Sequence, residues 1–269
     1  MPVFTRDNVN FFYRDTGAGR PFFFQHGLGA DSSQTFGIFT PPPGIRLLSF
    51  DCRAHGETQP LGDPEKIRLA AFADDLGAFM DRLGIERAVI GGISMGAAIT
   101  LNFTLRHPGR VLGLVQSRPA WLDVPCPWNV RMFSLVAGLV RQHGAKRGQE
   151  LFKQTEAFRE TLEDWPDVAN SLVLQFEHPR IEESAFKLEQ IIKDAPCRDR
   201  HEWAKIQVPT LVLANALDPI HPYEYAEVIA GLIPGAELHE ITSKSVSLDR
   251  HNADTQRCLT EFLERNFGS

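Results

Sequence analysis

The sequence predicts an α/β fold, in which helices cover both faces of a mostly parallel sheet and a helical segment interrupts the second half of the chain. In residues 1–116, short apolar runs typical of buried strands alternate with longer stretches of helical periodicity. The joints between them are short, which favours parallel strands joined by helices. The alternation stops after Gln116 and resumes at Pro209.

The elements before the interruption follow from apolar patterning and from turn residues. Asp7-Asn8 separates two short runs and predicts an opening hairpin over 3–6 and 9–14, followed by a loop over 17–21. An unbroken apolar run predicts a buried strand over 21–25, and a second strand follows Pro41-Pro42-Pro43-Gly44. The further predicted elements are strands over 46–50, 87–90 and 111–116 and helices over 68–83 and 95–106.

The elements after Gln116 predict a cap and then a return to the sheet. Residues 121–200 have helical character broken by prolines, which indicates an inserted helical cap. A strand over 210–214, a helix over 223–232, a strand over 236–241 and a helix over 249–266 complete the core. The predicted division is core 1–117, cap 118–200 and core 201–269.

Composition restricts the class of protein. With 269 residues, 43% of them apolar and 23% charged, the chain fits one large globular domain with an insert. A net charge of −6 offers no basic field for a phosphate backbone, which argues against nucleic acid as a partner. No run of 18 apolar residues and no secretion signal occur, so no membrane association is expected. The four cysteines show no zinc spacing. We expect a cytoplasmic protein without a metal; whether it forms a homo-oligomer is left open.

The motif Gly92-Ile93-Ser94-Met95-Gly96 carries the strongest chemical signal. It follows a predicted strand and opens a predicted helix, which is the context that a nucleophile elbow requires. The bend is too sharp for side chains at positions 92 and 96, so glycine occupies both. Ser94 is then expected as an exposed nucleophile beside a helix N-terminus. The alternative is a turn of small residues that only lets strand and helix pack.

The motif His26-Gly27-Leu28-Gly29 follows a predicted strand and predicts half of an oxyanion hole. The Leu28 amide, together with the Met95 amide, would face the carbonyl oxygen of a substrate, and each such donor is typically worth about 3 kcal/mol. His26 itself is expected to be structural. A third block, Asp51-Cys52-Arg53-Ala54-His55-Gly56, is expected to tie adjacent loops together.

These three blocks, in this order and spacing, resemble the α/β-hydrolase fold family over nearly the whole chain. The resemblance implies an eight-stranded sheet, a helical cap, no metal, no organic cofactor and a triad in the order Ser, Asp or Glu, His. It also places the acid at Asp218, after the strand over 210–214, where a carboxylate orients an imidazole. Asp123 is the alternative acid, at a position used by some members.

The catalytic histidine does not stand where the family pattern puts it. Counted back from Phe262, that position falls on or near Ser245, and serine does not take a proton at neutral pH as imidazole does. His251 lies in the correct connection but six residues later, in the first turn of the predicted final helix. His221 is expected at the rim and His239 within a strand. Three cap histidines remain as sources of a base: His143, His178 and His201.

Two functions follow. The first is a hydrolase that acts on a small, largely apolar ester, lactone or diketone through an acyl-enzyme on Ser94, with Asp218 and His251 completing the triad. Trp121 and Trp128 are expected to line its apolar substrate site, and Arg118 is a candidate anchor for a substrate carboxylate. The second is a catalytically silent ligand-binding protein on the same scaffold. The partner in both is a small carbonyl compound.

Overall fold

The computed structural model describes residues 2–268, which form one eight-stranded sheet in the order β1-β2-β4-β3-β5-β6-β7-β8. β1 pairs antiparallel with β2 and β2 with β4, and every later pair is parallel. The predicted α/β class with a mostly parallel sheet is confirmed. The strands are β1 (Val3–Arg6), β2 (Val9–Gly17), β3 (Arg20–Gln25), β4 (Ile45–Phe50), β5 (Ala88–Ile93), β6 (Val111–Ser117), β7 (Thr210–Ala214) and β8 (Glu237–Glu240).

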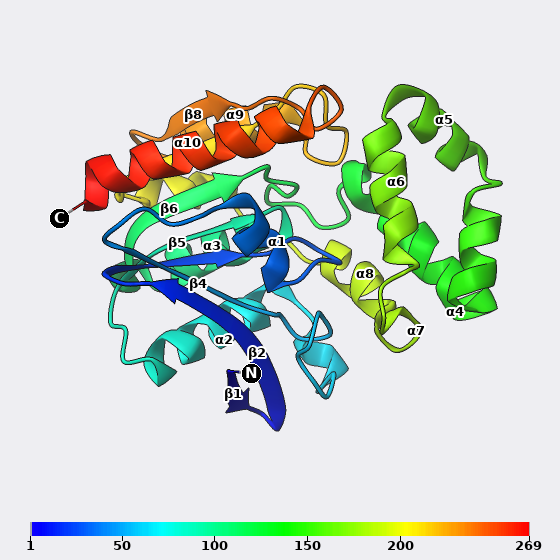
Figure 1. The fold of residues 1–269 in the computed structure, drawn as a ribbon, viewed down its shortest axis with the longest axis horizontal. Helices are drawn as coiled ribbons and strands as arrows, with labels where there is room; N and C mark the ends of the chain where they lie inside the picture. Colours follow the sequence, from blue (N-terminus) through cyan, green and yellow to red (C-terminus); the bar gives the residue numbers. More distant parts are fainter. Residues whose placement is uncertain (1, 269) are drawn as a thin grey trace.

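Helices cover both faces of this sheet (Figure 1). One face of the sheet is covered by α2, α3 and α9, whose buried side chains belong to the larger apolar cluster. The other face is covered by α1 and α10, whose buried side chains belong to a second cluster. Parallel strands buried on both sides read as continuous apolar runs, which explains Phe22-Phe23-Phe24 in β3. These helices are α1 (Ser32–Ile38), α2 (Leu69–Arg82), α3 (Met95–Arg106), α9 (Tyr223–Leu232) and α10 (Leu248–Phe267).

The segment between β6 and β7 is helical and lies to one side of the sheet, at the right of Figure 1. Its α-helices are α4 (Arg131–Phe152), α5 (Glu156–Asp164), α6 (Pro166–Gln175), α7 (Ile181–Ser184) and α8 (Phe186–Gln190). Short 3-10 turns complete the chain: η1 (Pro64–Lys66), η2 (Pro108–Arg110), η3 (Trp128–Val130), η4 (Ile191–Lys193) and η5 (Arg200–Lys205). None of the helices in residues 2–268 is long and apolar enough to cross a membrane.

Three local predictions differ from the structure. α1 was not predicted, because seven residues that start at the Asp31 cap are too few to show helical periodicity. β2 continues to Gly17, which shortens the predicted loop over 17–21 to Ala18-Gly19 before β3 begins. β5 continues beyond its predicted end through Gly91-Gly92-Ile93, where glycine, which is disfavoured in strands, indicated no strand. Glycine is needed at Gly91 because a side chain there would meet Val115 of β6.

A buried ion-pair network ties the loop after β4 to α2. Arg53, 1% exposed, donates from Nε and Nη2 to the two oxygens of Asp75, each at 2.7 Å. Asp75 also accepts from Arg6, and Arg53 donates to Asp7 in the β1–β2 turn at 2.8 Å. The arginine of the third motif therefore joins neighbouring loops, as expected, and the His55 Nδ1 atom lies 2.8 Å from the carbonyl of Arg53.

We expect Asp75→Asn to lower the free energy of unfolding by about 3–5 kcal/mol, because it leaves the buried Arg53 guanidinium without its main counter-charge. Urea denaturation measures this loss. Asp74→Asn is the matched control, since Asp74 pairs with Arg106 at the surface, where such pairs are worth about 0–1 kcal/mol. Equal losses for the two variants would contradict the importance of the network.

Candidate active site

The turn between β5 and α3 has the geometry of a nucleophile elbow. Ser94 adopts φ 56° and ψ −110°, a left-handed backbone that non-glycine residues seldom take. A Cβ added at Gly92 would lie 2.2 Å from the carbonyl carbon of Gly96, and one added at Gly96 would lie 2.2 Å from the carbonyl oxygen of Gln25. Both glycines are therefore required by the close approach of backbone to backbone. Ser94 is 9% exposed and faces a cavity.

The loop after β3 lies beside this elbow and is held by side-chain bonds to backbone. His26 accepts from the Cys52 amide through Nε2 at 3.0 Å, and its Nδ1 lies 2.8 Å from the Gly27 carbonyl, so both of its ring nitrogens are occupied. The Gly27 amide donates to Gln34 at 2.8 Å. Leu28 lines the cavity beside Ser94. Within residues 2–268, no group accepts a hydrogen bond from the Leu28 or Met95 amide, which leaves both amides available to an oxyanion.

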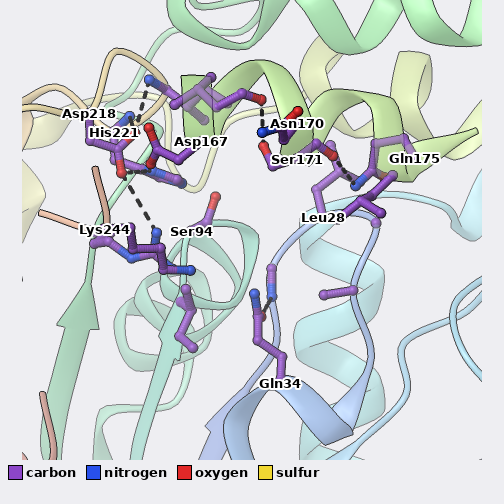
Figure 2. A pocket seen from close by; sticks show the side chains of 18 of the residues that line it. Leu28, Gln34, Ser94, Asp167, Asn170, Ser171, Gln175, Asp218, His221 and Lys244 are labelled. Carbon is purple, nitrogen blue, oxygen red and sulfur yellow. Dashed lines mark hydrogen bonds and ion pairs between the residues drawn. The ribbon is translucent and has the colours of Figure 1, made fainter. Parts of the chain in front are cut away.

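The cavity has a volume of about 440 Å³ and lies between the carboxyl ends of the strands and helix α6. Figure 2 shows Ser94 between the pair Asp218 and His221 on one side and Leu28 on the other, with Ser171 and Gln175 of α6 nearby. The lining residues are Gly27, Leu28, Gly29, Ala30, Gln34, Ile93, Ser94, Arg118, Phe133, Asp167, Val168, Asn170, Ser171, Leu174, Gln175, Asp218, Ile220, His221, Lys244 and Leu248.

Asp218 lies in the loop after β7 and is held in its ionised form. Its Oδ2 is 2.7 Å from His221 Nδ1 and 3.6 Å from Arg118 Nη1, and its Oδ1 accepts from the amides of Ile220 and His221 at 3.2 Å. Burial alone would raise the pKa of this carboxyl, but the His221 ring and the Arg118 guanidinium hold it well below its ordinary value. The structure thus brings Asp218 to the same cavity as Ser94.

His251 does not line this cavity. It lies in the first turn of α10, as predicted, with its ring fully buried and its Nδ1 2.8 Å from the Thr242 carbonyl. Its Nε2 has no partner in the described part of the chain. Burial, followed by the nearby Arg118 charge, lowers the pKa of His251 to about 4. The expected constellation of Ser94, Asp218 and His251 is therefore not assembled, since His251 does not line the cavity and its Nδ1 contacts the Thr242 carbonyl and not Asp218.

The other candidates for acid and base also lie elsewhere. Asp123 is bound to Arg200, whose Nε donates to it at 2.7 Å, and it does not line the cavity. The inserted histidines His143, His178 and His201 are likewise absent from its lining.

His221, which we expected at the rim, lies inside the cavity with a side chain only 11% exposed. Among residues 2–268, no three His, Cys, Asp or Glu side chains are grouped so as to hold a metal ion.

The predicted substrate-binding residues divide into one that reaches the cavity and two that do not. Arg118 lines it, is 6% exposed, and has an Nε without a partner among the described residues. Trp121 is instead buried in the apolar core, and Trp128 is 59% exposed outside the cavity. Their assignment is corrected, since the presence of aromatic residues in a helical segment does not show which way each side chain points. The apolar lining comes from Leu28, Ile93, Phe133, Val168, Leu174, Ile220 and Leu248.

Two charged lining residues were missed in the sequence. Lys244 follows β8, directly before Ser245, and the repulsion of Arg118 followed by burial lowers its pKa to about 8. Asp167 comes from the first turn of α6, and its Oδ1 is buried with no partner in residues 2–268. Lys244 stands in the loop after the last strand, where the family pattern places the catalytic histidine, so its position in the sequence already indicated a place near the site. Asp167 offered none, because the orientation of α6 is a tertiary property.

Comparison with known proteins agrees with this architecture. The family model described as alpha/beta hydrolase fold matches residues 20–245, and the chain therefore belongs to the α/β-hydrolase fold family. This membership confirms the resemblance carried by the three motifs.

Individual relatives are distant but extend over most of the chain. The AB hydrolase superfamily protein YisY of Bacillus subtilis (strain 168) is 29% identical over 244 residues, 87% of each chain. The bifunctional esterase/perhydrolase DCH of Acinetobacter calcoaceticus is 25% identical and covers 82% of this chain and 83% of that protein. The structure of a thermophilic esterase from Thermogutta terrifontis superposes with a TM-score of 0.72 at 24% identity, covering 96% of this chain and 94% of that one. The two relatives from Bacillus subtilis and Acinetobacter calcoaceticus support hydrolysis as the general reaction, and the esterase structure shows the shared fold.

Proposed function

We propose that the protein is a serine hydrolase that forms an acyl-enzyme on Ser94. The observation that carries the proposal is the elbow itself, because Ser94 sits at φ 56° with its side chain on a cavity of about 440 Å³. Strained backbone at such a position is typical of functional sites. The relative from Acinetobacter calcoaceticus, an esterase and perhydrolase, supports carbonyl chemistry at this site.

In the proposed reaction the hydroxyl of Ser94 attacks the carbonyl carbon of the substrate. The Leu28 and Met95 amides stabilise the oxyanion, the alcohol or enolate departs with a proton, and water then hydrolyses the acyl-enzyme. The apolar lining suits a small, largely apolar ester, lactone or diketone. Arg118 reaches the cavity with an unpartnered Nε among the described residues, which suits a substrate that also carries a carboxylate.

A ligand-binding protein without turnover is the competing function. It is favoured by one observation, namely that no described residue forms a hydrogen bond with the Ser94 hydroxyl. Catalytic hydrogen bonds are often long in structures without substrate, so this observation does not outweigh the elbow.

A fluorophosphonate probe tests the proposal. We expect stoichiometric labelling that mass spectrometry maps to the peptide containing Ser94, together with hydrolysis of p-nitrophenyl acetate and butyrate. Ser171 is an internal control because it lines the same cavity from α6 without an elbow. No labelling and no turnover, with stabilisation of the protein by small carbonyl compounds in thermal unfolding, would support the ligand-binding protein instead.

A further inference from the structure

His221 is the histidine that lines the same cavity as the nucleophile Ser94. The Asp218 carboxylate accepts from the amides of Ile220 and His221, and this turn brings the His221 ring back onto the carboxylate three residues earlier. His221 Nδ1 then lies 2.7 Å from Asp218 Oδ2. With Nδ1 donating its proton to the carboxylate, Nε2 carries the free lone pair, and it is hydrogen-bonded to no other described residue.

No other histidine has this position. Of the nine histidines in the sequence, all of them within the described residues, His221 alone lines the cavity with Ser94. His26 uses both ring nitrogens on backbone groups, and His251, whose Nδ1 lies 2.8 Å from the Thr242 carbonyl, does not line the cavity. Figure 2 shows His221 and Asp218 together on the side of the cavity next to Ser94.

We propose that His221 is the general base and acid of the reaction, with Asp218 as its orienting partner, so that both groups come from the loop after β7. This inference rests on the proposed function. His221 Nε2 takes the proton from Ser94 Oγ as the new bond to the carbonyl carbon forms. It gives that proton to the leaving oxygen or carbon as the old bond breaks. A water molecule then passes one proton to Nε2 while its oxygen attacks the acyl group, and the proton returns to Ser94 Oγ.

The charges around His221 set the pH at which it works. Four charged groups line its surroundings: Asp218 on its own loop, Arg118 after β6, Lys244 after β8 and Asp167 on α6. Burial, with help from Arg118 and Lys244, lowers the pKa of His221 below 6.5, although Asp218 opposes this. A base must be neutral to accept a proton, so kcat/KM should rise with pH through a pKa below 6.5 and stay level at neutral pH.

The hydrogen bond between Ser94 and His221 is expected to form only when substrate is bound. No hydrogen bond joins Ser94 Oγ to His221 Nε2 in this structure, and such contacts often tighten only in the Michaelis complex. Both side chains face the same cavity, so a bound substrate that contacts Leu28 and Ser94 excludes water between them.

Paired substitutions test the assignment. His221→Ala should lower kcat for p-nitrophenyl acetate, and the rate of phosphonate labelling at Ser94, by at least about 100-fold. Added imidazole should restore part of the rate, which a purely structural role would not allow, and the low-pH inflection should disappear. His239→Ala is the matched control, since His239 lies on β8, 40% exposed beside Glu237, and should keep the parent rate.

These experiments distinguish a failure of the His221 assignment from a failure of the proposed serine hydrolase function. Labelling of Ser94 that survives His221→Ala within threefold, and falls with His251→Ala, would overturn the assignment while leaving the serine hydrolase in place. Absence of labelling in the parent protein would remove both. Thermal unfolding of each variant confirms that a lost rate is not a lost fold.

Discussion

Ser94→Ala is expected to lower kcat for p-nitrophenyl esters by about 10⁴-fold or more. Removing the nucleophile of an acyl-enzyme mechanism removes the bond-forming atom, and the residual rate then comes only from binding and from the oxyanion donors. Alanine lacks only the hydroxyl and keeps the Cβ that this backbone at φ 56° already accommodates, so the fold and the cavity should be kept. Steady-state kinetics with the parent protein, Ser94→Ala and Ser33→Ala measure the effect, the last being a serine on the exposed side of α1.

The Michaelis constant gives the second readout of this variant. If binding of the substrate depends on the apolar lining and on Arg118, KM should change far less than kcat. Turnover in Ser94→Ala within tenfold of the parent would mean that water, and not Ser94, attacks the carbonyl. The phosphonate label would then be absent as well, and the acyl-enzyme would have to be abandoned.

The strands and the elbow could be predicted because their main signals lie in short stretches of the sequence. Continuous apolar runs such as Phe22-Phe23-Phe24 mark strands buried on two faces, and α3 and α9 begin and end where the patterns predicted. Gly92 is required by the backbone of Gly96 within the same turn, so the motif itself indicates the turn, whereas Gly96 is required by the backbone of Gln25 on the neighbouring strand β3. The placing of Ser94 at the end of β5 followed from this.

The proposed base could not be predicted, because its identity depends on how loops from two strands meet in space. In the sequence, His221 stood beside the acid and was expected at the rim, while His251 stood in the connection that the family uses. The structure reverses their exposure to the cavity: the turn at Asp218 folds His221 inward, and the first turn of α10 directs His251 onto the Thr242 carbonyl. The spacing of residues along the sequence does not indicate the orientation of either side chain.

The substrate contacts of the helices between β6 and β7 could not be predicted for a similar reason. A helix contributes one side to a cavity, and which side depends on packing against the neighbouring helices. α6 contributes Asp167, Ser171 and Gln175 to the cavity lining, whereas Trp121 packs into the core. Polar side chains therefore contribute more of this wall than the tryptophans of the sequence suggested, and they are the positions at which substrate preference should respond to substitution.

Asp218→Asn is expected to lower kcat by about 10⁴-fold while leaving the protein folded. Asparagine has nearly the same shape, but its amide group presents donors as well as an acceptor to His221 Nδ1, which lies 2.7 Å from the carboxylate in the parent. The ring would then take the tautomer with its proton on Nε2, and a base that already holds this proton does not accept the one on Ser94. The variant also loses the negative charge that stabilises the imidazolium formed during the reaction.

The loss of this charge should also appear in the pH profile. Asp218 opposes the lowering of the His221 pKa, so in Asp218→Asn the residual activity should reach its plateau at a lower pH than in the parent. Asp123→Asn is the matched control, because Asp123 follows β6, pairs with Arg200 and does not line the cavity. Its kcat should stay within threefold of the parent. A larger loss at Asp123 than at Asp218 would move the acid to the loop after β6 and would leave the Asp218–His221 pair a structural contact.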